Sequence, residues 1–324
     1  MTLTKAVLAF IKDSRLFSPG DRVIVAVSGG ADSIALAHVL IHSRAQLGIQ
    51  LHLAHYNHKT RKSADADQRF VEKFARQFQV PLTVECRPRP QGFLTEDEAR
   101  RLRFDFLVRL ARQWKAQSVA LAHTKSDVAE TVLMRLIRGA GLYGLRGILP
   151  TRHLQGICFV RPLLDVKRLD VEKYLSAHKM QFCMDTSNLK TIYLRNKVRL
   201  ELLPLLVKAY NPRMADALTV IAAIAQEDYD FLNLEATKRF KEMVVRSKGM
   251  VKIGLTKIKD QHPAMQRLLI RLMMEDLMGD PSALNFNHIG ELEDLLSMRP
   301  VGSLVHLPQG YKARRTKNYL EISL

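Results

Sequence analysis

The residues best suited to chemistry form a short glycine-rich run between an apolar segment and a helical pattern. Two glycines let the backbone turn tightly and approach an oxyanion closely. The helix that follows offers unpaired N–H groups and the positive end of its dipole. The run contains neither GK[ST] nor G-x-G-x-x-G, so it is not a Walker loop or a dinucleotide fingerprint. It predicts a phosphate site formed by Ser28, Gly29, Gly30, Ala31, Asp32 and Ser33.

One acid, Asp32, lies inside this predicted phosphate loop. A carboxylate beside phosphates is unfavourable unless a cation lies between them. We therefore expect Mg²⁺, held in part by Asp32. The alternative is a strand–helix turn whose glycines serve the backbone geometry alone.

Further polar residues follow the expected second and fourth strands, on the same edge as the loop. His58 and Arg61 could contact a phosphate or a base, although an isolated histidine is more often structural, and His123 begins a similar run. Asp127 and Glu130 are three residues apart and share one helical face. This pair could hold a metal or an ammonium group, or simply complement the helix dipole.

The segment 95–114 has the pattern of a long, arginine-rich helix. Thr95 and Glu98 offer a capping box at its start. Arg100 and Arg103 are one turn apart and share a face. This face is either part of a site or an ordinary solvated surface.

Short apolar runs alternate with helical spacing through the first half of the chain. Repeated β-then-α units predict an α/β fold with a Rossmann-like parallel sheet and right-handed crossovers. The expected strands are 23–27, 51–55, 80–86, 118–122 and 160–164, and the expected helices are 32–47, 64–78, 95–114, 126–138 and 166–178.

The pattern changes near residue 210. We expect an α/β domain over residues 1–209 and a smaller, mainly helical α+β domain over residues 210–324. Residues 139–150 read as a loop. The remaining expected elements are a basic helix at 193–206, a long helix reaching about residue 245, helices at 263–278 and 287–298, and strands at 303–307 and 319–323.

The net charge and the cysteine content limit which binding partners and metal sites are plausible. Fifty Lys plus Arg against 32 Asp plus Glu give a net charge of +18. This excess suggests a polyanion, and nucleic acid first; a basic, solubility-tuned surface is the alternative. We expect no signal peptide and no bilayer-spanning segment, hence no membrane role. Three separated cysteines without a CxxC pair give no support to zinc or iron–sulfur sites and fit the cytoplasm.

Six motifs follow one another along the chain: SGGADS, HYNHKTRKSADAD, EARRLRFDFL, AHTKSDVAETVLMRLIRGAGLYGLRGI, RPLLDV and DTSNLKTIYLRNKVRLELLPLL. Their order resembles that of the tRNA(Ile)-lysidine synthase family, within the PP-loop ATP pyrophosphatase superfamily. SGGADS alone indicates only the superfamily. Ser126 departs from the acid that is frequent in this family, and we expect one altered metal or water contact rather than lost activity.

This resemblance implies a carbon–nitrogen ligase that modifies the wobble cytidine of tRNA(Ile) with a CAU anticodon. The cytosine C2 oxygen attacks the α-phosphate of ATP and releases pyrophosphate; the ε-amine of L-lysine then attacks C2 and expels AMP. Residues 1–209 would be the PP-loop ATP-binding catalytic domain, and residues 210–324 would bind tRNA.

The resemblance also implies a role for each site residue. The 28–33 loop and Arg103 would hold the phosphates of ATP. Asp127 and Glu130 would bind the lysine ammonium group, and Arg195 would meet the nucleotide or the adenylated intermediate. Asp32, with Mg²⁺, completes the catalytic set, and His58, Arg61 and His123 would support it. Residues expected to bind the tRNA backbone are Lys197, Arg199, Lys312, Arg314 and Arg315.

Other functions remain open at this point. Another PP-loop tRNA modifier, such as a cytidine 2-thiolase, usually needs paired cysteines or a cluster. A GMP- or asparagine-synthetase-like ligase would leave the charge of +18 unexplained. A non-catalytic RNA-binding paralogue would not need the acids Asp32, Asp127 and Glu130. A homodimer is compatible with all of these.

Overall fold

The computed structural model describes residues 2–60, 63–87, 95–183, 194–279 and 286–324. Residues 1–134 with 147–219 form one compact unit, and residues 135–146 with 220–324 form the other. The expected boundary at residue 210 lies about ten residues before this division, which falls within helix α10 (Met214–Met243). A continuous helix leaves no turn signal in the sequence at the point where the units divide. In the described parts of the chain, no helix is long and apolar enough to cross a bilayer.

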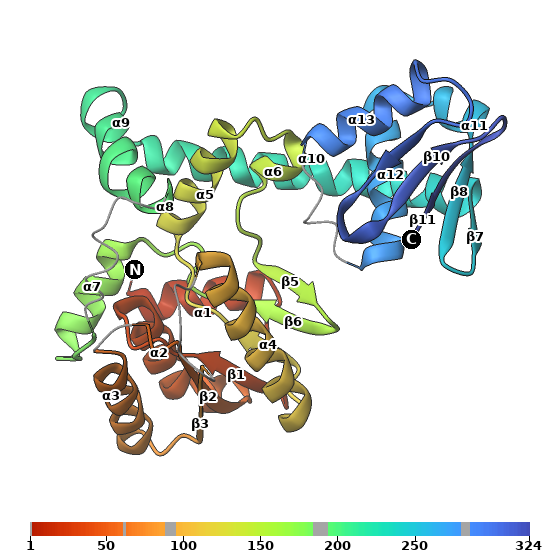
Figure 1. Ribbon diagram of the computed structural model, residues 1–324. Helices are drawn as coiled ribbons and strands as arrows, with labels where there is room; N and C mark the ends of the chain where they lie inside the picture. Colours follow the sequence, from red (N-terminus) through yellow and green to blue (C-terminus); the bar gives the residue numbers. More distant parts are fainter. Residues whose placement is uncertain (1, 61–62, 88–94, 184–193, 280–285) are drawn as a thin grey trace. The chain divides into compact units, whose positions relative to one another are not determined.

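A six-stranded sheet organises the first unit (Figure 1). Its strand order is β3-β2-β1-β4-β6-β5, in which β5 alone runs antiparallel to its neighbour. The expected Rossmann-like parallel sheet is therefore confirmed. The strands are β1 (Arg22–Ala26), β2 (Gln50–Asn57), β3 (Leu82–Cys86), β4 (Ser118–Ala120), β5 (Thr151–Leu154) and β6 (Ile157–Val160).

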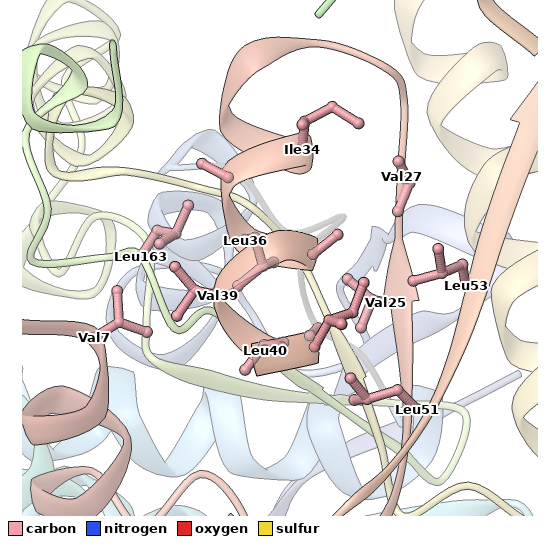
Figure 2. Close-up of a cluster of buried hydrophobic side chains, with 14 of the residues drawn as sticks. Val7, Val25, Val27, Ile34, Leu36, Val39, Leu40, Leu51, Leu53 and Leu163 are labelled. Atoms are coloured by element: carbon pink, nitrogen blue, oxygen red, sulfur yellow. The ribbon is translucent and has the colours of Figure 1, made fainter. Parts of the chain in front are cut away.

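Helices cover both faces of this sheet because β1 is apolar on both sides. Val23 and Val25 pack in the larger core with α1, α2, α3 and α7, whereas Ile24 packs in a second core with α4. Figure 2 shows Ile34, Leu36 and Leu40 of α2 directed at this larger core beside β1. The helices are α1 (Leu3–Asp13), α2 (Ala31–Leu47), α3 (Ala64–Gln77), α4 (Glu96–Trp114), α5 (Lys125–Ile137) and α7 (Arg168–Ala177).

The topology gathers the loops after the parallel strands at one edge of the sheet. β1, β4 and β6 run in the same direction, so their carboxyl ends lie at the same edge of the sheet. Helices α2 and α5 begin at this edge, and Arg161 follows β6 there. In open α/β sheets this edge is where ligands bind. Further along the chain, after α7, come α8 (Leu194–Lys197), a π-helical stretch (Val198–Leu202) and α9 (Leu203–Ala209).

The second unit combines helices with a five-stranded antiparallel sheet, in the order β7-β8-β11-β10-β9. Its core is formed between this sheet and helices α12 and α13. This agrees with the expected smaller α+β part. Its remaining elements are α6 (Leu142–Leu145), β7 (Val244–Ser247), β8 (Met250–Gly254), α11 (Leu255–Lys259), α12 (Pro263–Met278), α13 (Phe286–Ser297), β9 (Leu304–His306), β10 (Lys312–Arg315) and β11 (Tyr319–Ser323).

Two hairpins differ from the sequence-based expectations. The strand expected at 160–164 lies at Ile157–Val160, because Pro162 has no N–H to donate to a ladder and the chain turns there. It pairs with β5, a strand that was not expected. The hairpin β7–β8 was also not expected; its strands are only four and five residues long.

Candidate active site

The turn between β1 and α2 holds the glycine loop in a defined shape. Gly29 has a φ of +91°, which glycine adopts without the steric cost of a side chain. Ser33 Oγ donates to the Gly30 carbonyl (2.9 Å) and accepts from the Ser28 amide (3.2 Å). Gly30 is the N-cap of α2, and no side chain of the described residues caps it. The first N–H groups of the helix thus remain available to an anion.

Cys183 packs directly against this loop. Its amide donates to the Gly29 carbonyl (2.9 Å). A Cβ placed on Gly29 would lie 3.3 Å from Cys183 Sγ. Nothing in the local sequence pattern indicates this contact between two residues 154 positions apart.

Asp32 is a carboxylate in an unfavourable environment. Its Oδ1 is buried and has no hydrogen-bond partner among the described residues. Burial, followed by the charge of Asp127, raises the pKa of Asp32 to about 6. An acid held in this way at the start of a helix is a suitable ligand for a cation that also contacts phosphate.

Asp127 is fixed at the start of α5. Its Oδ2 accepts from the amide (2.8 Å) and from Oγ1 (3.0 Å) of Thr124, so the acid reaches back over the first turn. Burial raises the pKa of Asp127, but the charge of Arg195 and the Thr124 amide outweigh burial and hold the pKa below its ordinary value. Asp127 is therefore ionised at neutral pH.

Two arginines form ion pairs with the carboxylates of Asp127 and Glu130. Arg195 donates to Asp127 Oδ1 (2.7 Å) and to Glu130 Oε2 (3.3 Å). Arg199 donates to Glu130 Oε1 (2.6 Å) and Oε2 (2.8 Å) and to Asp127 Oδ1 (3.0 Å). Glu130 is only 3% exposed, so these ion pairs are shielded from water. The π-helical stretch that contains Arg199 follows α8, which carries Arg195.

This arrangement brings together most of the expected catalytic residues and adds one. Arg199, which was expected to bind tRNA, lies with the two acids, so that two negative and two positive charges balance. Its expected neighbour Lys197 is exposed. The π-helical geometry that turns Arg199 to this position has no signature in hydrophobic spacing.

His58, His123 and Arg103 lie at the same edge. Burial and the Arg103 charge lower the pKa of His58 to about 4. Burial also lowers the pKa of His123, against the opposing effect of Asp127. Nδ1 of each histidine is buried without a hydrogen-bond partner in the described part of the chain. Both rings are therefore neutral at pH 7.

The residues expected to bind tRNA in the second unit differ in exposure. Lys312 and Arg314 are exposed on β10, on either side of buried Ala313. Arg315 is half-buried, and its Nη1 donates to the carbonyls of Leu295 (3.3 Å) and Arg299. Arg315 thus has a structural contact that the sequence did not indicate. Arg61 lies outside the described residues.

Comparison with known proteins places this site in a family. Residues 1–206 match the PP-loop domain family. The tRNA(Ile)-lysidine synthase of Geobacter sulfurreducens is 38% identical over an alignment that covers 97% of this chain and 67% of that protein. The protein of the same name from Clostridioides difficile is 32% identical and covers 96% of this chain, with 68% of its own length matched. The chain belongs to the tRNA(Ile)-lysidine synthase family.

The match to these lysidine synthases extends over about two thirds of their length. It covers nearly all of this chain, and therefore most of both compact units. The expected family resemblance is confirmed.

A more distant likeness concerns the fold alone. The U34-tRNA thiolase NcsA from Methanococcus maripaludis, a structure with its [4Fe-4S] cluster, superposes with a TM-score of 0.58 at 17% identity. The match covers 69% of this chain and 78% of the thiolase chain. Membership of the lysidine synthase family rests on far higher identity, so the cytidine 2-thiolase alternative is not the better supported one.

Proposed function

We propose that this chain is a tRNA(Ile)-lysidine synthase, an AMP-forming ligase. It would adenylate the wobble cytidine of tRNA(Ile) with a CAU anticodon and then join L-lysine to it. The observation that carries the proposal is the convergence of the glycine loop, Asp32 and the Asp127–Glu130 pair, all at one edge of the sheet. A phosphate site beside a pair of acids suits a reaction between ATP and an amine. Family membership supports the same chemistry.

In the first step the glycine loop would hold the departing pyrophosphate. The cytosine C2 oxygen attacks the α-phosphorus, and the bond from that phosphorus to the bridging oxygen breaks, leaving pyrophosphate with the electron pair. The amides at the start of α2 donate to this group as its charge grows. Arg103 is a second donor for the phosphate or the adenylate.

Asp32 fits an Mg²⁺ ion. Its buried, unpartnered Oδ1 is an oxygen ligand of the kind Mg²⁺ prefers. Among the described residues no three His, Cys, Asp or Glu side chains form a complete metal site. Water and phosphate oxygens would supply the remaining ligands, as is usual for this ion. When bound, Mg²⁺ neutralises negative charge on the phosphates.

In the second step Asp127 and Glu130 would bind the lysine substrate through its ammonium group. Arg195 makes two hydrogen bonds to the pair, whereas Arg199 makes three. We propose that the ammonium group replaces Arg195, whose guanidinium then turns to the nucleotide phosphate. This exchange keeps the buried acids paired throughout, since an unpaired buried charge is costly.

The bond-forming event needs a neutral amine. One of the two carboxylates takes a proton from the lysine ε-ammonium, and the amine nitrogen attacks C2 of the adenylated cytosine. The C2–O bond breaks and AMP leaves with the electron pair. The second nitrogen proton leaves to solvent, and the pyrimidine becomes lysidine.

The tRNA would bind through exposed cations. Lys197 in the first unit, and Lys312 and Arg314 in the second, are exposed and could neutralise backbone phosphates. The target cytidine must leave its stack to reach the sheet edge. Because the substrates are ATP and tRNA, we propose a cytoplasmic location.

The deciding experiment is incubation of the protein with ATP, Mg²⁺, radiolabelled L-lysine and a transcript of tRNA(Ile) with a CAU anticodon. We expect label in the tRNA, a nucleoside with the mass of lysidine, and AMP with pyrophosphate as products. A transcript with uridine at the wobble position is the control and should take up no label. Release of ADP, or label without the lysidine mass, would contradict the proposed function.

A further inference from the structure

Arg161 is a buried cation with no acidic partner among the described residues. It follows β6 at the carboxyl edge of the sheet and is 4% exposed. Its Nη1 donates to the Leu149 carbonyl (2.7 Å), but its Nε is buried with no hydrogen-bond partner in the parts of the chain described. No described carboxylate forms an ion pair with it. Burying an unpaired charge is costly, so a bound anion is the natural complement.

Two more arginines lie close enough to Arg161 for their charges to act on it. Burial, followed by the charges of Arg152 and Arg100, lowers the pKa of Arg161 to about 10. The guanidinium therefore remains charged at neutral pH. Positive charges gathered in one place favour an anion over a cation as the ligand.

The fold explains why these arginines meet. Arg152 lies on β5 and pairs in register with Phe159 of β6. The Phe159 ring contacts Phe104 of α4, with centroids 4.9 Å apart. Arg100, one turn earlier on α4, has its guanidinium 5.4 Å from the Phe104 ring centroid. An aromatic pair therefore places a helix cation and a strand cation beside Arg161.

A purely structural role for Arg161 explains only part of these observations. Its Nη1 bond holds the Leu149 carbonyl and so fixes the chain before β5. That bond requires neither two further guanidinium groups nor a buried Nε left unsatisfied. Most buried donors find a partner, so an unsatisfied one needs an explanation.

The cluster borders the candidate active site. Arg161 also acts on His123, together with Asp127, Arg195 and Arg103. Two strand spacings separate β1, which carries the glycine loop, from β6, or about 10 Å. This is close enough for one nucleotide or a short piece of RNA backbone to contact both places.

We propose that Arg161, Arg152 and Arg100 form a second phosphate site beside the glycine loop. Its ligand is a phosphate group, either a backbone phosphate of the tRNA near the reacting cytidine or a phosphate of the nucleotide. The inference rests on the proposed function for these two sources. Arginine forks match phosphate oxygens in geometry and charge.

The test is binding, measured without turnover. The double variant Arg100→Gln with Arg152→Gln removes the two outer charges, and Arg161→Lys keeps the inner charge but removes its fork. Arg101→Gln is the matched control, because Arg101 is an exposed cation on the same helix. For each, the Kd for the tRNA(Ile) transcript is measured at several salt concentrations, and the Kd for ATP is measured without tRNA.

We expect the double variant to weaken binding of one ligand about tenfold, as loss of a charge-assisted hydrogen bond does. Arg161→Lys should weaken the same ligand, and Arg101→Gln neither. A weaker tRNA complex with a salt slope lower by about one identifies a backbone phosphate; weaker ATP binding identifies the nucleotide. Unchanged affinities in a folded double variant overturn the proposal, even if Arg161→Lys fails to fold. Affinities change independently of the product formed, so this result is separable from failure of the proposed function.

Discussion

Arg199 Nε lies 2.6 Å from Glu130 Oε1, within a pair whose carboxylate is almost fully buried. This contact ties the π-helical stretch to helix α5. Arg199 carries a charge that the sequence alone assigned to tRNA binding. Because Arg199 pairs with Glu130, it lies at the position where the proposed amine substrate would bind.

Replacing Arg199 should therefore weaken the use of lysine and leave tRNA binding unchanged. Arg199→Met leaves Glu130 and Asp127 with Arg195 alone, so the lysine subsite loses its shape. We expect the KM for lysine to rise about tenfold or more, as loss of charge-assisted hydrogen bonds implies, with an unchanged Kd for tRNA. Lys197→Met is the matched control, since this exposed neighbour should weaken tRNA binding and leave the lysine KM unchanged. The reverse pattern would return Arg199 to tRNA binding.

Asp32→Asn should stabilise the fold while removing activity. The folded-state pKa of Asp32, about 6, exceeds the ordinary value of 3.8, so ionisation of this acid opposes folding. The cost is absent below about pH 4, grows as the pH rises to 6, and is constant above that, reaching at most about 3 kcal/mol. Urea unfolding of both proteins from pH 4.5 to 8 measures the difference. A gap that does not grow over this range would show that Asp32 is not strained.

The same pair of proteins tests the cation site. Mg²⁺ with pyrophosphate should stabilise the wild-type protein by mass action and the Asp32→Asn variant much less. Equal stabilisation of the two would separate Asp32 from the metal.

Gly29→Ala should weaken ATP binding through the backbone. Alanine at a φ of +91° is strained by about 1 kcal/mol or more, and its Cβ would press on Cys183 Sγ at 3.3 Å. We expect the Kd for ATP, measured by calorimetry, to rise roughly tenfold, or about 1.4 kcal/mol. Gly20→Ala is the control, because Gly20 has a φ of +92° but nothing within 4 Å of its added Cβ. An equal ATP affinity in both variants would mean that the loop geometry is not needed.

The basic strand β10 should divide into two functions. Lys312→Ala with Arg314→Ala removes two exposed charges, so the salt slope of tRNA binding should fall by about two. Arg315→Ala removes the donor to the Leu295 and Arg299 carbonyls, and should instead destabilise the second unit by about 2 kcal/mol in urea unfolding. A lowered salt slope with Arg315→Ala and an unchanged slope with the double variant would reverse these assignments.

The sequence predicted the parts of the fold that depend on local pattern. Val23 and Ile24 are apolar neighbours, which indicated a strand covered on both faces, and they do lie in two different cores. The glycine loop could also be located, because its turn and helix start are set by neighbouring residues.

Features that depend on distant contacts could not be predicted in this way. Arg199 meets Glu130 across 69 positions, through a π-helical stretch that leaves no periodic signal. Arg161 is a single arginine in a short motif, and only the pairing of β5 with β6 and the packing of Phe104 on Phe159 reveal its surroundings. Tertiary packing sets these positions, and one sequence contains no direct record of it.

Helix α5 begins in the first compact unit, and its last residues, from Arg135 onward, belong to the second. The segment 135–146 then contributes Tyr143 and Arg146 to a stack in which the Arg146 guanidinium lies 3.9 Å from the Tyr229 ring centroid. The first unit therefore cannot be excised with one cut after residue 219. Such a truncated chain would keep an orphaned insertion, with Tyr143 and Arg146 stripped of their aromatic partner, so a minimal catalytic fragment would need this insertion redesigned as well.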